Sequence, residues 1–172
     1  ELANNMIIRS SLEDELDYLQ AFLVEQGSNQ WNYLPEAGVN EQFQRLTLGS
    51  DRCLVAVDNE AVVGMAIYRQ PGDAPKIFTN FVNLSHVVYV AEVVVHSEFT
   101  GKGIGSALMD EIIMIAKKLG AKELVIDRHE QNLASAGMMG KVGFKELDCF
   151  VDLRRREAGS QKTSILSLKL QD

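Results

Sequence analysis

A nearly continuous run of β-branched residues, followed closely by three alternating glycines, is the feature that most restricts how this chain folds. Residues 87–95 predict a central strand buried on both faces, because such strands read as unbroken apolar runs. Gly101, Gly103 and Gly105 then form a turn, and the apolar spacing from Ile104 to Leu119 predicts a helix. A strand that passes through a tight turn into a helix indicates an α/β fold.

The remaining segments predict strands and helices that extend this unit into a mixed α/β sheet. Residues 58–60 read as the turn of a hairpin. The expected strands are 6–9, 53–57, 61–69, 124–127, 145–154 and 163–170, and the expected helices are 12–26, a segment ending near 49, and 132–141. We expect residues 6–172 to form a single domain, and residues 1–5 to precede a natural start at Met6.

Composition excludes several classes of protein. With 46% apolar and 24% charged residues, the 172-residue chain has an ordinary globular composition. No apolar stretch approaches the roughly 20 residues of a membrane helix, so we expect no membrane partner. The net charge of −7 argues against nucleic acid, because phosphate binding rests on cationic contacts. Two cysteines and no signal segment indicate a cytoplasmic protein.

The glycine turn has the properties of an anion site. Backbone N–H groups are unpaired at a helix N-terminus, the helix dipole favours negative charge, and glycine lets the backbone approach closely. The P-loop pattern does not occur, and the last position of a dinucleotide fingerprint is Ser106 or Leu108 rather than glycine or alanine. A plain strand-to-helix turn is the alternative interpretation.

Two motifs resemble those of the GNAT superfamily, the acetyl-CoA-dependent N-acetyltransferases. The stretch 100–105, Thr-Gly-Lys-Gly-Ile-Gly, is similar to motif A, written Arg/Gln-x-x-Gly-x-Gly/Ala. Residues 132–144 resemble the second motif, in which an Asn opens a helix that ends in Lys-x-Gly-Phe. The resemblance implies a mostly antiparallel sheet of about seven strands, with a splayed central parallel pair and about four helices.

The resemblance also implies acetyl-CoA as the acetyl donor. Its pyrophosphate would lie on the backbone amides of residues 102–106, and its pantetheine arm would pair with the end of the central strand. The expected donor-binding residues are Val93, Val94, Val95, Thr100, Gly101, Lys102, Gly103, Ile104, Gly105, Ser106 and Asn132. A homodimer is a further expectation, because dimers are common in the family.

Three positions depart from the family pattern. Thr100 replaces the usual Arg or Gln, so we expect weaker donor binding. Met139 stands where many members carry a Tyr that protonates the departing thiolate, and a thioether cannot donate a proton. Ser135 stands where the family usually has Ala. The general acid is therefore absent, replaced by water, or supplied from elsewhere.

Glu92 is the candidate general base, because it is the only charged residue within 87–95. Burial of a lone carboxylate would raise its pKa toward neutrality. Strict alternation predicts that Glu92 shares a face with Val88, Val90 and Val94 and that Tyr89, a reserve acid, lies on the opposite face. The alternatives are a structural carboxylate paired with an Arg or Lys for Glu92, and a core aromatic residue for Tyr89.

Other candidates have weaker signals. Trp31 and Tyr33 lie in a loop where they would line the acceptor pocket, or pack two helices together. His129 stands apart from any ligand spacing, so we expect no metal. Residues 154–156, three arginines in a row, read as a solvated strand end, with a grip on the 3′-phosphate of the cofactor as the lesser alternative.

The predicted activity is transfer of an acetyl group from acetyl-CoA to a primary amine by direct attack on the thioester. The whole net charge lies in residues 1–86, which hold five Lys or Arg against twelve Asp or Glu. This favours a small cationic acceptor such as a polyamine, amino sugar or amino-acid derivative, although a solvated surface explains the same excess. The competing hypotheses are an inactive acetyl-CoA sensor and a nucleotide or sugar-phosphate enzyme.

Overall fold

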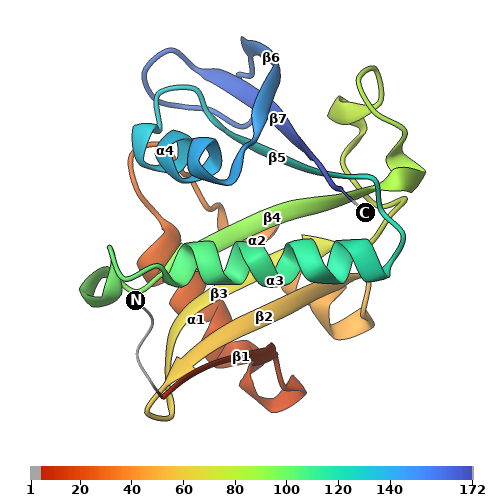
Figure 1. The fold of residues 1–172 in the computed structure, drawn as a ribbon. Coiled ribbons are helices and arrows are strands. Elements are labelled where there is room, and N and C mark those ends of the chain that lie inside the picture. The colour runs from red at the N-terminus through yellow and green to blue at the C-terminus, as the bar shows by residue number, and fades with distance from the viewer. Residues whose placement is uncertain (1–4, 172) are drawn as a thin grey trace.

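Seven strands and four α-helices make up the computed structural model, which describes residues 5–171 (Figure 1). The strands are β1 (Met6–Ser10), β2 (Asp51–Asp58), β3 (Ala61–Arg69), β4 (Val87–Val95), β5 (Glu123–His129), β6 (Lys145–Val151) and β7 (Lys162–Lys169). The helices are α1 (Leu16–Gly27), α2 (Glu36–Leu48), α3 (Ile104–Lys118) and α4 (Leu133–Val142).

The strands form one mixed sheet in the order β1-β2-β3-β4-β5-β7-β6. Every neighbouring pair is antiparallel except β4 and β5, which are parallel. Their pairing extends only from Val87 opposite Glu123 to Val90 opposite Ile126, although both strands continue beyond it. The predicted fold, including the splayed parallel pair at its centre, is confirmed.

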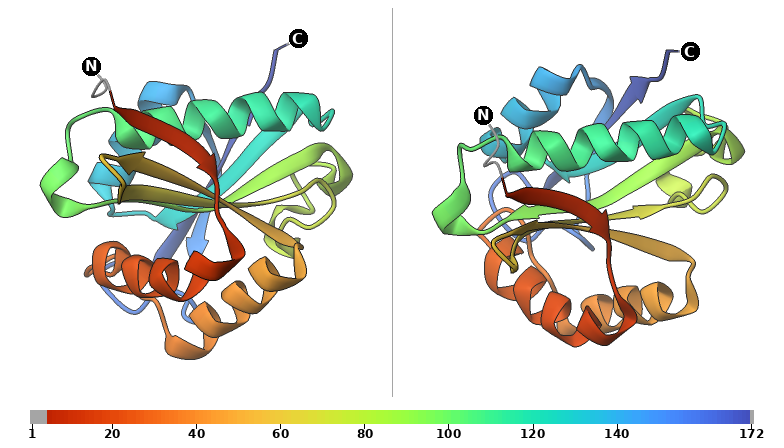
Figure 2. Two further views of the ribbon diagram at one scale, coloured as in Figure 1. Left: turned by 90° about the horizontal axis from the view of Figure 1, so that it is seen from below. Right: turned by 60° about the horizontal axis from the view of Figure 1, so that its bottom comes forward.

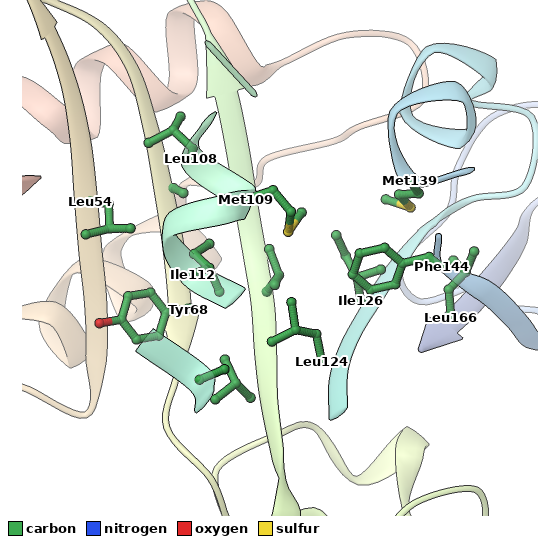
Figure 3. Close-up of a cluster of buried hydrophobic side chains, with 14 of the residues drawn as sticks. Leu54, Tyr68, Leu108, Met109, Ile112, Leu124, Ile126, Met139, Phe144 and Leu166 are labelled. Atoms are coloured by element: carbon green, nitrogen blue, oxygen red, sulfur yellow. The ribbon is translucent and has the colours of Figure 1, made fainter. Parts of the chain in front are cut away.

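Helices cover both faces of the sheet (Figure 2). The apolar face of α3 packs with α4 on one side, where Leu108 and Ile112 are fully buried against β2–β5 (Figure 3). On the other side α1 and α2 cover β2–β4, with Leu19 and Leu23 fully buried. The first half of β4 is buried on both faces, as its continuous apolar sequence predicts, with Val88 and Val90 on the side of α3 and Val87 and Tyr89 on the other side.

Within residues 5–171, none of the four α-helices covers the second face where β4, β5 and β7 meet. The connection between β3 and β4 folds back over this region and places Phe78 at 0% exposure against Val125 and Ile165. This packing fixes the paired half of β4 and β5, so the divergence of the two strands begins from a rigid base.

Two predicted boundaries differ from the structure by three residues or more, and the others by two residues at most. The first helix begins at Leu16 rather than near Leu12, because a short 3-10 turn precedes it. The Glu15 carboxylate folds back to accept hydrogen bonds from Leu12 N at 2.7 Å and Arg9 Nη1 at 2.7 Å. The strand predicted over 145–154 ends at Val151, since the chain then turns into the loop that carries Arg155 and Arg156.

Candidate active site

A cleft of about 410 Å³ opens where β4 and β5 separate. One wall is the free end of β4 from Ala91 to Val95, and the other is β5 from Ile126 to His129. Helix α4 and the loop between α1 and α2 also line it. Because the unpaired ends of two parallel strands form its walls, the cleft follows directly from the sheet topology.

The glycine turn borders an adjoining cavity of about 260 Å³, which shares Val95, Thr100 and Met138 with the cleft. Gly101 and Gly103 adopt φ angles of +78° and +79°, which only glycine adopts without strain. Among the described residues, no intramolecular acceptor is found for the backbone N–H groups of 101–106. The turn therefore presents a row of free donors at the N-terminus of α3.

The edge of β4 that faces β5 also carries free backbone groups. The amide of His96 donates to Val63 O over 2.9 Å, on the side of β3. Because backbone N–H groups alternate between the two sides of a strand, those of Val95 and Val93 face the gap. The gap thus has the properties of a strand-pairing edge.

Helix α4 supplies the third side of the cleft. Asn132 caps this helix, since its Oδ1 accepts from Ser135 N at 3.2 Å. Met139 is 2% exposed and packs into the core, as Figure 3 shows, and the Ser135 hydroxyl lies 3.9 Å from its sulfur. No phenolic donor therefore stands at this position of α4.

Glu92 lies on the wall of the cleft, half-buried, and within the described part of the chain its carboxylate has no hydrogen-bond or ion-pair partner. Burial, and then the charge of Asp127, raise its pKa to about 8, while Arg155 and Arg156 act in the opposite direction. The paired structural carboxylate considered above is not what the structure shows.

A β-bulge corrects the predicted faces of β4. Ile67 lies opposite Glu92 but Tyr68 lies opposite Val90, so Ala91 is an extra residue. Arg69 lies opposite Tyr89, and Ile67 and Arg69 share a face of β3. Glu92 and Tyr89 are consequently on the same face, not opposite ones.

Val88 and Val90 pack toward α3, whereas Val94 packs toward α1. The prediction that Glu92 and Val94 share the face of Val88 and Val90 is therefore also wrong, for the same reason: the extra residue at Ala91 reverses the alternation.

Asp127 is the centre of a hydrogen-bonded cluster beside Glu92. One of its oxygens accepts from the Tyr89 hydroxyl at 2.5 Å, and the other accepts from Arg155 at 2.6 Å and Arg156 at 2.8 Å. Burial raises the pKa of Tyr89, and the neighbouring Asp127 raises it further. The Tyr89 hydroxyl thus holds Asp127 in place.

Of the two predicted aromatic residues, Trp31 lines both the cleft and a side pocket beside it, whereas Tyr33 lines only the side pocket. Trp31 packs against His129 with ring centroids 4.8 Å apart, whereas Tyr33 is 58% exposed. His129 is buried, and its Nε2 lies 2.7 Å from Ala158 O while its Nδ1 accepts from Gln131 N. These contacts hold the β6–β7 loop against the cleft.

The model of the acetyltransferase (GNAT) family matches residues 16–144, most of the chain. The chain belongs to the acetyltransferase (GNAT) family. This match spans α1 to the end of α4, and so includes the glycine turn and every cleft residue except Arg155 and Arg156. The prediction of an N-acetyltransferase is confirmed at the level of the family. No curated protein matches the chain.

Solved GNAT structures share the fold over nearly their full length. An N-acetyltransferase from Staphylococcus aureus Mu50 is 20% identical, with a TM-score of 0.75 over 98% of this chain and 100% of that one. The acetyltransferase yncA of Salmonella typhimurium, solved with its cofactor acetyl-CoA, is 22% identical, with a TM-score of 0.72 over 98% and 96%. A ribosomal-protein-alanine N-acetyltransferase from Brucella melitensis is 24% identical, with a TM-score of 0.71 over 95% and 99%.

The structure brings most predicted site residues together around one cleft. Val93, Val94, Val95, Thr100 and Asn132 line it, and Gly101, Gly103, Ile104, Gly105 and Ser106 line the adjoining cavity. The Lys102 side chain instead lies over the Phe99 ring, with its nitrogen 4.9 Å from the centroid.

Sequence analysis missed the residues around Asp127. Arg156 is 7% exposed, so the interpretation of 154–156 as a solvated strand end is wrong for it. The signal in the sequence that could have indicated this cluster is Asp127 itself, a lone Asp at the end of an apolar strand. Within residues 5–171, no helix is both long and apolar enough to cross a membrane, and no three His, Cys, Asp or Glu side chains are grouped as metal ligands would be.

Proposed function

We infer that the protein transfers the acetyl group of acetyl-CoA to a primary amine by direct attack of the amine on the thioester. The observation that carries this proposal is the cleft between the diverging ends of β4 and β5, which has an unpartnered carboxylate on its wall and a row of free amides at one end. A cytoplasmic location fits the two free cysteines, Cys53 and Cys149.

The residues present fit acetyl-CoA as the donor. The unpaired amides of 102–106 would hold the pyrophosphate, and a Cβ on Gly101 would meet nothing within 4 Å, so the approach to the turn is open. The backbone of Val93 and Val95 would pair with the pantetheine arm by strand addition. The bound donor supplies an activated acyl carbon for attack by an amine.

Glu92 is the group in the cleft suited to accept the amine's proton, directly or through water. An alkylamine with a pKa near 10.4 is protonated at pH 7, so freeing its lone pair costs roughly 4–5 kcal/mol. A positioned base typically contributes about 10²- to 10⁴-fold to the rate. Holding two reactants in place contributes about 7–11 kcal/mol, so positioning by the cleft is the larger effect.

Release of free thiol tests the proposal. We expect the protein to release thiol from acetyl-CoA when a suitable member of an amine panel is added, and to release little without an amine. The panel should contain polyamines, amino sugars and amino-acid derivatives, with the acetylated product identified by mass spectrometry. Stoichiometric acetyl-CoA binding without turnover on any amine would overturn the proposal.

That negative result is the expectation of the competing hypothesis, a sensor that binds acetyl-CoA without turnover. The observation that favours it is Met139, which is buried where many family members carry an acidic hydroxyl. Since positioning contributes more than a single acid, an enzyme without this acid can still turn over, and we expect catalysis.

A further inference from the structure

Arg155 is the exposed arginine of the cleft and has unused hydrogen-bond donors. It extends from the β6–β7 loop, is 40% exposed, and lines both the cleft and the side pocket of about 190 Å³ beside it. Its Nη2 donates to Asp127, and among the described residues Nε and Nη1 have no acceptor. A guanidinium has five N–H groups in a planar fork, so most of them remain available.

The other two arginines of the cleft, Arg128 and Arg156, are less exposed than Arg155. Arg156 is buried and uses Nε on Thr163, at 2.8 Å, as well as Nη2 on Asp127. Arg128 is half-buried, directs Nη1 at the carbonyl oxygens of His129 and Glu130, and has a buried Nε that an anion in the cleft cannot reach. Arg155 is therefore the arginine of the cleft that is best exposed to an entering anion.

Of the carboxylates that line the cleft, Glu92 is the one without a hydrogen-bond partner among the described residues. Both oxygens of Asp127 already accept hydrogen bonds, and Asp152 accepts from the Thr163 hydroxyl outside the cleft. Glu157 is exposed and lines only the side pocket. Glu92 is thus the one carboxylate on the cleft wall that is free to receive an ammonium group, and a second ammonium group would find no equivalent there.

The acidic first half of the sequence does not change this balance. The residues it contributes to the cleft are all uncharged, namely Gln26, Gly27, Asn29, Trp31 and Asn32. The net charge that favoured a cationic acceptor therefore lies elsewhere on the surface.

We propose that the acceptor is an amino acid or a similar amine bearing a carboxylate, with its amino group at Glu92 and its carboxylate on the free side of Arg155. This inference rests on the proposed acetyl transfer and narrows its acceptor class. The Arg155 fork matches a carboxylate, and Glu92 and Arg155 line the same cleft, so one small molecule can contact both groups.

The test compares matched acceptors that differ only in their charge. Alanine, leucine, methionine, phenylalanine and 4-aminobutyrate are each assayed against their primary amides, alongside putrescine and spermidine, by thiol release. We expect the best acid to exceed its amide by about 10- to 100-fold in kcat/KM, which is typical of a hydrogen bond to a charged group. Equal rates for acid and amide, or a preference for the polyamines, would overturn the inference and leave acetyl transfer intact.

Two variants separate recognition from structural support. Arg155→Gln should raise the KM of the acid by the same factor and leave the KM of the amide unchanged, because Arg156 and Tyr89 still hold Asp127. Loss of the Arg155 charge also acts on the pKa of Glu92, and any resulting change in kcat should be equal for acid and amide. Arg154→Gln, at the exposed neighbouring arginine, should change neither KM. An Arg155→Gln variant that loses activity equally on acid and amide would show that Arg155 only supports Asp127.

A binding measurement covers the case in which no amine is turned over. Each amino acid is titrated calorimetrically into the protein saturated with CoA, for the wild type and Arg155→Gln. Binding of an acid but not its amide to the wild type, lost in the variant, supports the carboxylate site even if acetyl transfer fails. Absence of binding by every acid overturns it.

Discussion

At the scale of single residues, the chemistry of the cleft depends on the half-buried carboxylate of Glu92. Burial raises the pKa of Glu92 to about 8, and the charge of Asp127 acts in the same direction. The protonated form, which cannot accept a proton, therefore dominates below pH 8. We expect kcat/KM of the wild type to rise with pH through an ionisation near pH 8. In Glu92→Gln this ionisation should be missing from the pH profile, and the rate should be reduced about 10²- to 10⁴-fold.

The pH profile should be measured with an acceptor whose own ionisation is known, so that its contribution can be subtracted. Glu25→Gln is a matched control, because Glu25 is an exposed carboxylate on α1 away from the cleft. A Glu92→Gln variant with the wild-type profile would remove Glu92 from the role of base.

Asp127 gives a second prediction at this scale, because it both binds Arg155 and Arg156 and acts on Glu92 through its charge. In Asp127→Asn the pKa of Glu92 should fall, so the rise of kcat/KM should move to lower pH. The buried Arg156 would lose its charged partner, so we expect a loss of about 3 kcal/mol in the free energy of unfolding.

Urea unfolding and a pH–rate profile of the same Asp127→Asn preparation check both parts of this prediction. The pH–rate profile distinguishes loss of the Asp127 charge from a general loss of packing, because a loss of packing would lower stability without moving the ionisation of Glu92. A variant as stable as the wild type, with its pH profile unmoved, would contradict the described cluster.

Residue patterns predicted Glu92 but not its surroundings. It stood out as a single charge in an apolar strand, and that is a local signal. Its face could not be predicted, because the bulge at Ala91 is an irregularity in the pairing of β4 with β3 and leaves no mark on the alternation of valines. Arg155 and Asp127 are 28 residues apart, so no spacing rule connects them.

At the scale of elements, the first turn of α3 would bind the pyrophosphate of acetyl-CoA through its backbone N–H groups. A side chain in this turn would hinder that approach. Gly105 lies in the first turn of α3 and lines the cavity beside the glycine turn. A Cβ there would lie 3.5 Å from Met138 Sδ, an ordinary contact, so the fold tolerates it. Gly105→Ala should therefore stabilise the helix by roughly 0.5–1 kcal/mol yet weaken acetyl-CoA binding about tenfold or more.

Gly137→Ala is the matched control for this variant. Gly137 is an exposed helical glycine of α4, and a Cβ on it would meet nothing within 4 Å. It should gain similar helix stability without any change in acetyl-CoA affinity, measured by calorimetry. If Gly105→Ala bound acetyl-CoA as tightly as Gly137→Ala, the glycine turn would not be the donor site.

Elements were more predictable than the site because their signals are local. The run 87–95 and the apolar period after Ile104 predicted the bounds of β4 and the start of α3 correctly. The start of α1 was missed, because the Glu15 carboxylate competes with the backbone for hydrogen bonds at that point. A side chain that folds back on its own segment changes a boundary that periodicity alone would extend.

At the scale of the whole molecule, the sheet consists of two parts that meet along a short seam. Strands β1–β4 carry α1, α2 and α3, whereas β5–β7 carry α4 (Figure 1). The seam is the parallel pairing of Val87–Val90 with residues 123–126, and beyond it the cleft separates the two parts. A ligand in the cleft would contact both β4 and β5, and thus both parts of the sheet. Its binding should therefore raise the free energy of unfolding of the whole domain.

This arrangement gives a prediction that discriminates among donors without requiring turnover. At 100 times its dissociation constant, a ligand that binds only the folded state adds about 2.7 kcal/mol, which corresponds to an increase in Tm of roughly 5–11 °C for a chain of this size. We expect acetyl-CoA and CoA to produce this increase, and NAD or ATP to produce little. Gly105→Ala should reduce the acetyl-CoA response, whereas Gly137→Ala should keep it. Stabilisation by NAD or ATP alone would favour a nucleotide enzyme and place the amides of the glycine turn in a different reaction.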